Sequence, residues 1–175
     1  AVLENKSEEL NIGIVNFDKN SRNGQERERG FKDFVKKDNR VKNVETINVI
    51  STVEQAKNQT KEFLEEHQEM NVLVTFNEWT SLGVGYAVRE LGLQDKIQVV
   101  AFDNNVISVG MLETGEVDAL IVQNPYAMGY LGVESAYNLL NEIPIKGKQV
   151  DTETICATRE NMYDDEYQKT LFAFE

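Results

Sequence analysis

Short apolar runs of strand length alternate along the chain with longer segments of helical period. The strand-length runs, several of them apolar almost throughout, are residues 11–17, 44–50, 72–76, 97–102 and 119–122. The segments with apolar residues at every third or fourth position are residues 26–37, 53–67, 80–91, 105–113 and 126–140. A continuous apolar run is typical of a strand covered on both faces, and the longer period predicts helices between the strands.

The strict alternation of strand and helix predicts an α/β fold with a doubly wound, mostly parallel sheet flanked by helices. We expect a five-strand core. One further extended segment, residues 153–158, leads into a polar tail.

Local signals support the boundaries of three helices. Ser51, with Glu54 three residues later, has the spacing of a capping box where helix 53–67 should begin. Gly92 stands where helix 80–91 should end. Pro125 stands in the first turn of helix 126–140, where its missing N–H costs no hydrogen bond.

The composition limits the classes of function. The chain has 175 residues, enough for one domain, and no apolar run approaches the roughly 20 residues of a membrane-spanning helix. Its formal net charge is −12. Because affinity for nucleic acid depends largely on Lys and Arg, we expect no nucleic-acid partner for this chain.

The sequence offers few residues or motifs for catalysis or for cofactor binding. Cys156 is the only cysteine, and His67 is the only histidine, in an acidic stretch typical of a solvated helix end. Gly83 and Gly85 lie inside helix 80–91 and lack the third glycine of a dinucleotide-binding fingerprint. The sequence contains no Walker loop and no cluster of metal ligands, so we expect no cofactor, no metal and no enzyme activity.

Polar side chains follow three of the five strand-length runs. Asn77, Asp103 and Gln123 each stand where a run ends. Open parallel sheets bind ligands at the carboxyl ends of their strands, so the fold would bring all three to one edge. Arg27, near the start of the first helix, adds a charge to this edge. Each residue alone is also explained as a turn former or a surface charge; together they favour a site for the hydroxyl groups of a sugar.

Aromatic residues stand beside these polar ends. Phe76 and Phe102 each end an apolar run, and Trp79 begins the third helix. Phe76 and Trp79 are therefore candidates for contact with a sugar ring, with core packing as the alternative for both.

Four motifs resemble the type I periplasmic-binding-protein superfamily in its ribose- and galactose-binding branch. They are RERGF at residues 27–31, VTFNE at 74–78, VVAFDN at 99–104 and IVQNPYAMGY at 121–130. The resemblance extends over residues 11–162. In the family, the residues that match Arg27, Asn77, Asp103 and Gln123 contact the sugar, so the resemblance implies the same residues as the strand ends do.

The resemblance also implies that the chain is one lobe of a two-lobed protein. Residues 1–123 would form the C-terminal, ligand-binding lobe. Residues 124–149 would be a crossover helix that belongs to an N-terminal lobe absent from this sequence, and residues 150–175 a return segment and tail. Without that lobe, helix 126–140 carries more apolar surface than a solvated helix can, which predicts a homodimer through it.

The function implied is that of a solute-binding component of a bacterial ABC transporter. It would hold a sugar or a similar small polar solute and deliver it to a membrane permease. We then expect a periplasmic or extracellular location, with a lipid anchor on an absent N-terminal part as one option. The alternatives are the effector-binding domain of a lactose-repressor-type regulator and that of an extracellular sensor.

Overall fold

The computed structural model describes residues 9–145, 147 and 149–172, and these form six strands and six helices. The strands are β1 (Leu10–Asn16), β2 (Val41–Asn48), β3 (Val72–Thr75), β4 (Gln98–Phe102), β5 (Ala119–Gln123) and β6 (Thr154–Thr158). The helices are α1 (Arg22–Val35), α2 (Val53–Glu66), α3 (Glu78–Leu91), α4 (Val106–Thr114), α5 (Pro125–Leu140) and α6 (Asp165–Leu171).

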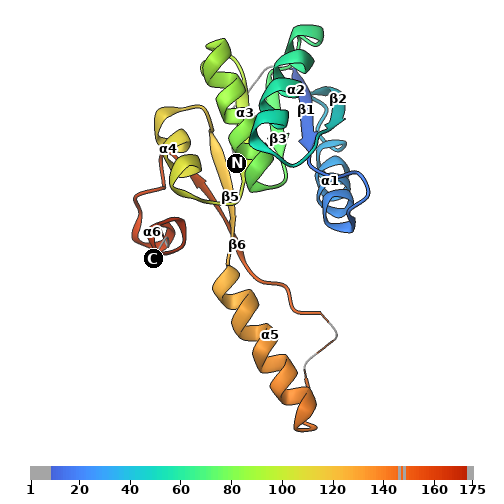
Figure 1. Cartoon of the computed structure of the whole chain (residues 1–175), viewed down its shortest axis with the longest axis vertical. Helices are drawn as coiled ribbons and strands as arrows, with labels where there is room; N and C mark the ends of the chain where they lie inside the picture. Colours follow the sequence, from blue (N-terminus) through green and yellow to red (C-terminus); the bar gives the residue numbers. More distant parts are fainter. Residues whose placement is uncertain (1–8, 146, 148, 173–175) are drawn as a thin grey trace.

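The six strands form one sheet in the order β2-β1-β3-β4-β5-β6 (Figure 1). The first five are parallel, and β6 runs antiparallel to β5. The predicted α/β class with a mostly parallel five-strand core is therefore confirmed, and the last extended segment is an antiparallel sixth strand.

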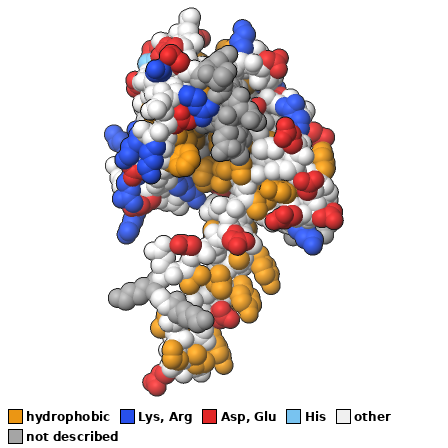
Figure 2. All heavy atoms as spheres, turned by 180° about the vertical axis from the view of Figure 1, so that it is seen from behind, with side chains coloured by type: hydrophobic (Ala, Val, Ile, Leu, Met, Phe, Trp, Pro, Cys, Tyr) orange, Lys and Arg blue, Asp and Glu red, His pale blue; other side chains and the backbone are white. Residues whose placement is uncertain are grey.

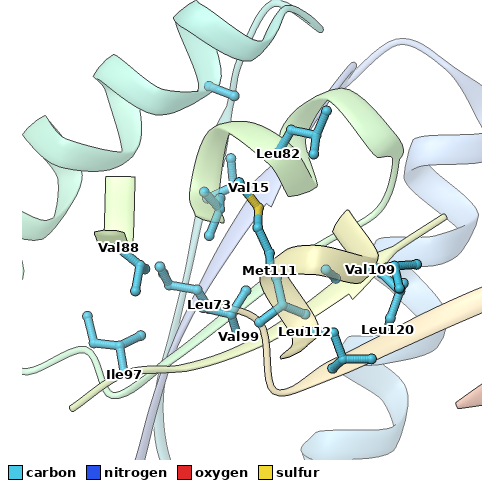
Figure 3. Close-up of a cluster of buried hydrophobic side chains, with 14 of the residues drawn as sticks. Val15, Leu73, Leu82, Val88, Ile97, Val99, Val109, Met111, Leu112 and Leu120 are labelled. Atoms are coloured by element: carbon cyan, nitrogen blue, oxygen red, sulfur yellow. The ribbon is translucent and has the colours of Figure 1, made fainter. Parts of the chain in front are cut away.

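The direction of the connections decides which face each helix covers. The connection from β1 leads to β2 at one edge of the sheet. The connections from β2 to β3, from β3 to β4 and from β4 to β5 all run towards the other edge. Right-handed crossovers then place α1 on one face and α2, α3 and α4 on the opposite face. The larger apolar core lies on this second face, where Leu73 and Val99 from the sheet meet Met111 of α4 (Figure 3).

Side-chain caps fix the starts of the helices. Ser21 caps α1, and Asn105 forms a complete capping box with Ser108 at α4. The cap predicted at Ser51 is wrong by one residue: Thr52 caps α2 by accepting from the N–H of Gln55. A one-residue shift is easily missed because two hydroxyl residues stand side by side.

The end of α3 is as predicted. Gly92 has a φ of 63° in the left-handed region, where a side chain would be unfavourable.

Helix α5 leaves the sheet and projects from the rest of the molecule (Figure 1). Asn124 caps it, and Pro125 stands in its first turn, as predicted. None of its residues is buried. We call α5 together with the return to β6, residues 124–153, the arm, and the remaining described residues the body.

The polar tail contains a helix that the sequence pattern did not predict, because residues 165–171 form α6. Leu171 and Met162 are fully buried in the larger core, on the face of α2, α3 and α4. A helix of seven residues is too short to show an apolar period in the sequence, so only its packing reveals it.

Candidate functional site

Three neighbouring parallel strands end at one edge of the sheet, and each end carries a polar side chain. Asn77 follows β3, Asp103 follows β4 and Gln123 ends β5. Because β3, β4 and β5 are adjacent in the sheet, the structure places these predicted residues along one edge. We call this row the carboxyl edge.

Arg27 reaches the carboxyl edge from the first turns of α1. Its Nη1 donates to the backbone carbonyl of Phe76, and its Nη2 donates to Oε1 of Gln123 at 3.1 Å. The guanidinium carbon also lies 5.1 Å from the centre of the Phe102 ring, in cation–π range. These contacts hold a planar set of donors across the ends of three strands.

Gln123 connects Arg27 to Asp103. Its Nε2 donates to Oδ1 of Asp103 at 2.5 Å, while its Oε1 accepts from Arg27. Within the described part of the chain, the second carboxylate oxygen of Asp103 accepts no hydrogen bond. The row thus presents guanidinium donors and a carboxylate acceptor side by side.

The backbone at Asp103 has a left-handed conformation. Its φ is 64°, one of two positive values at non-glycine residues in the described chain. Asp tolerates this region better than most residues, and the N–H of Asp103 donates to the carbonyl of Ile121 at 2.9 Å. Strand β5 therefore fixes the turn that presents this carboxylate.

Asn77 has a structural role as well as a place at the edge. Its Oδ1 accepts from the N–H and the hydroxyl of Thr80, which caps α3, and its Nδ2 donates to Oγ of Ser51 at 2.8 Å. Ser51, considered above only as a helix cap, is thus part of the edge. A ligand that contacts Asn77 would share its Nδ2 with Ser51.

The two aromatic candidates differ in exposure. Phe76 is only 2% exposed, because its ring packs edge-on against Phe31 and Phe102, so it takes part in the site through its backbone carbonyl. Trp79 is 50% exposed in the first turn of α3. Of these two rings, Trp79 is the one open to a ligand.

A buried polar group supports α1 beneath Arg27. Asn16, fully buried at the end of β1, donates to Oε2 of Glu28 at 2.7 Å, and Oε1 of Glu28 accepts from Thr46 and Lys32. Partial burial acts to raise the pKa of Glu28. The hydrogen bonds from Lys32, Asn16 and Thr46 outweigh this effect, and the pKa lies below its ordinary value. Sequence reasoning missed this group, although a polar Asn16 inside an apolar run is a signal for it.

The described residues were also searched for metal-binding clusters, membrane-spanning helices and hollows near this edge. No group of three or more His, Cys, Asp or Glu side chains is arranged to hold a metal ion among them. Nor does any helix in that part of the chain combine the length and apolar character needed to cross a bilayer. A hollow of about 930 Å³ lies between α5 and the return segment, and it touches the carboxyl edge only through Gln123.

The arrangement is suited to binding rather than to covalent chemistry. Fixed donors on Arg27 and an acceptor on Asp103 match hydroxyl groups of a neutral polar solute.

Comparison with known proteins gives a consistent family match. The model of the periplasmic binding protein domain family matches residues 1–144. The D-ribose/D-allose-binding protein of Pseudomonas aeruginosa is 29% identical over 135 residues, which are 74% of this chain and 40% of that protein.

Two solved structures show the same fold. A carbohydrate transporter solute-binding protein from Agrobacterium radiobacter, in complex with D-arabinose, is 26% identical with a TM-score of 0.87, over 93% of this chain and 55% of that chain. An ABC transporter solute-binding protein from Agrobacterium vitis, with bound D-fucose, is 25% identical with a TM-score of 0.88. The match covers 97% of this chain and 58% of that chain. The chain therefore spans only about half the length of these relatives.

Proposed function

This chain belongs to the periplasmic binding protein domain family, and on that premise we propose that it is one sugar-gripping lobe of a transport protein of the ribose-binding branch. The intact protein would hold a sugar or a similar polar solute between two lobes. The ligand in this lobe would contact Arg27, Asn77, Asp103 and Gln123.

The observation that carries the proposal is the Arg27–Gln123–Asp103 row. Gln123 uses its oxygen for Arg27 and its nitrogen for Asp103, so its orientation is fixed from both sides. Preorganised donors and acceptors lose little freedom when a ligand binds. The second oxygen of Asp103 and the outer N–H groups of Arg27 are then directed at neighbouring hydroxyl groups.

Trp79 is proposed as the apolar contact of this lobe. A sugar ring has an apolar face of C–H groups as well as hydroxyl groups, and an exposed indole provides a matching surface. The half-exposed side chain of Trp79 stands two residues after Asn77, on the same edge. Phe76 would contribute indirectly, by positioning Arg27 through its carbonyl.

We also propose the division of the chain into residues 1–123 as the binding lobe, 124–149 as a helix of the other lobe, and 150–175 as the return. Its support is the contrast in burial, since α5 has no buried residue whereas every other helix has at least one. The share of each relative that the chain covers is also that of about one lobe.

The partners and location follow from the proposed role. Two relatives named as ABC transporter solute-binding proteins support a membrane permease as the partner. The family supports a location in the periplasm or outside the cell, to which a lipid anchor would be added if the intact protein carries one. For the chain alone, a homodimer through residues 126–140 stays a prediction. Sedimentation at micromolar concentration tests it, and a monomer at every concentration contradicts it.

Titration calorimetry of the full-length protein tests the site. We expect binding of at least one of D-ribose, D-allose, D-arabinose and D-fucose. Asp103→Ala should weaken that binding by about 3 kcal/mol, roughly 150-fold in Kd, because hydroxyl groups and Arg27 lose their acceptor. Asp95→Ala, an exposed aspartate before β4 at the opposite end of the sheet, is the matched control. Equal affinity of Asp103→Ala and the wild type would remove Asp103 from the site.

A further inference from the structure

The turn that carries Asp103 is bonded to a different part of the molecule at each of its three residues. The N–H of Asp103 donates to the carbonyl of Ile121 in β5 at 2.9 Å. Asn105 caps α4, and its Nδ2 donates to Oε1 of Glu78 in α3 at 2.7 Å. Asn104, which stands between them, is bonded to the C-terminal part of the chain.

The side chain of Asn104 caps the last turn of α6. Its Nδ2 donates to the carbonyl of Thr170 at 3.1 Å and to the carbonyl of Leu171 at 2.9 Å. Carbonyls in the last turn of a helix have no partner inside the helix, so a side-chain donor satisfies them. Helix α6 therefore ends against the residue that follows Asp103, close to the start of the arm (Figure 1).

Helix α6 has a small apolar anchor. It has seven residues, fewer than the roughly 12 that an isolated helix needs to be even marginally stable in water. Leu171 is its only buried residue, Tyr167 packs partly buried against the same core, and its other residues are polar. Seen from behind, charged side chains lie along the margin of the body next to the arm (Figure 2). An element with so few buried contacts opens locally at a lower cost than the rest of the core.

Asp103 depends on firm neighbours because its backbone has an uncommon conformation. A non-glycine residue with a φ of 64° persists in the left-handed region only where the surrounding structure holds it there. β5 holds Asp103 through its N–H, and the residue bonded to its carbonyl carbon is Asn104. The position of α6 thus bears directly on the orientation of the Asp103 carboxylate.

We propose, on the basis of the proposed function of the carboxyl edge, that Asn104 is a positioning residue and that docked α6 supports the sugar contact of Asp103. Asn104 and α6 act here without touching the sugar. Coupling of this kind is reciprocal, so a sugar held by Asp103 also stabilises the docked state of α6. Affinity at the carboxyl edge then depends on a segment 66 and 67 positions further along the chain.

Hydrogen exchange of the 175-residue chain, followed by NMR, tests the coupling without any ligand. Asn104→Ala should speed exchange at the N–H of Asp103 by at least about fivefold, because one side of the turn loses its support. Leu171→Ala should have a similar effect, since it removes the apolar anchor of α6. Amides of β1 and β3 should be accelerated less than that of Asp103 in both variants.

Sugar binding by the full-length protein tests the role in the site. The probe is whichever of D-ribose, D-allose, D-arabinose and D-fucose the wild type binds. Asn104→Ala and Leu171→Ala should each weaken binding by at least about fivefold, and the double variant should be no weaker than the weaker single variant, because both act through one contact. Leu64→Ala is the matched control, a buried leucine of the same core on α2. It should lower Tm as Leu171→Ala does and change the affinity by less than about twofold.

The reciprocal effect distinguishes a positioning role from a merely structural one. The N–H of Phe172 donates to the carbonyl of Gln168 at the end of α6 at 3.0 Å. Saturating sugar should slow exchange at this N–H in the wild type. It should not do so in Asn104→Ala, although that variant still binds.

Three results would decide against these ideas separately. An exchange rate at Asp103 that stays at the wild-type value in Asn104→Ala and Leu171→Ala overturns the coupling, with or without a sugar. Equal losses of affinity in Leu171→Ala and Leu64→Ala also overturn it, because affinity would then follow global stability. A wild type that binds none of the four sugars contradicts the proposed function, and the exchange rates at Asp103 then decide the coupling alone.

Discussion

Helices α3 and α5 resemble each other in sequence and differ completely in their surroundings. Both are rich in apolar residues, both contain two glycines, and both begin after an asparagine whose side chain accepts from the third residue on. Yet α3 has eight buried residues and α5 has none. Local signals thus determine that a helix forms, and only the surface opposite it determines whether its side chains are buried.

The contrast also shows what stabilises each helix. α3 packs on the sheet and beside α2, so its capping and its packing act together. α5 has Tyr126 81% exposed and Leu140 85% exposed, and none of its residues is buried. An isolated helix of 16 residues is marginal in water, so α5 depends on a partner surface that α3 already has.

The largest expected difference between body and arm is the cost of deleting a leucine side chain. Leu112 is fully buried in α4, and Leu112→Ala should lower the free energy of unfolding by about 3 kcal/mol through loss of burial and the cavity left behind. Leu140→Ala on the arm should change it by less than about 0.5 kcal/mol. Urea unfolding of the 175-residue chain measures both. A large loss from Leu140→Ala would show that the arm is packed.

A glycine-to-alanine pair should give effects of opposite sign. A Cβ at Gly83 would lie 2.4 Å from Cβ of Ala56 and 2.8 Å from backbone atoms of α2, so Gly83→Ala should destabilise the body by about 2 kcal/mol. A Cβ at Gly132 would meet nothing within 4 Å, and Gly132→Ala should stabilise α5 locally by up to about 1 kcal/mol. Hydrogen exchange resolved along the chain separates the two. Slower exchange in α5 is the expected result, and faster exchange there contradicts an open arm.

Removal of the N-terminal cap should affect stability differently in the two helices α3 and α5. Asn77→Ala removes the cap of α3 and the contact to Ser51, and should lower the stability of the body by about 1 kcal/mol. Asn124→Ala removes the cap of α5, and should fray the arm without a measurable change in the unfolding midpoint of the body. Circular dichroism and denaturant midpoints, taken on the same samples, check both.

The smallest expected effect is a pH dependence confined to the body. The pKa of Glu28 is lower in the fold than its ordinary 4.5, so its contribution to stability is complete above that value and is lost as the pH falls through the folded pKa. Glu28→Gln should remove about 1 kcal/mol at neutral pH and reduce the loss of stability in acid. Thermal melts from neutral pH to about pH 3 measure this slope. Identical slopes for the variant and the wild type would contradict it.

The fold was largely predictable from the sequence because its signals are local and repeat. Five apolar runs and five periodic segments were enough to infer a doubly wound parallel sheet. Two errors concern features whose signal is short or ambiguous: Thr52 rather than Ser51 caps α2, and α6 has only seven residues.

The candidate site was predictable in its residues and not in its connections. Strand ends indicated Asn77, Asp103 and Gln123, because the topology alone brings them to one edge. The orientation of Gln123 between Arg27 and Asp103 depends on distances that no sequence pattern encodes. The same is true of the burial of Phe76. Whether these residues bind a sugar stays a prediction.

The pairing of β5 with β6 has a consequence for how the chain could be rebuilt. Gln123 and Thr154 face each other at the ends of the two antiparallel strands. In connectivity the arm is therefore an insertion into a β-hairpin. Directly opposed residues in such a pair lie about 5 Å apart, a gap that a two-residue Asn-Gly turn closes. Replacing residues 124–153 by that turn would leave a shorter protein with Arg27, Asp103 and Gln123 still on their original strands and helix.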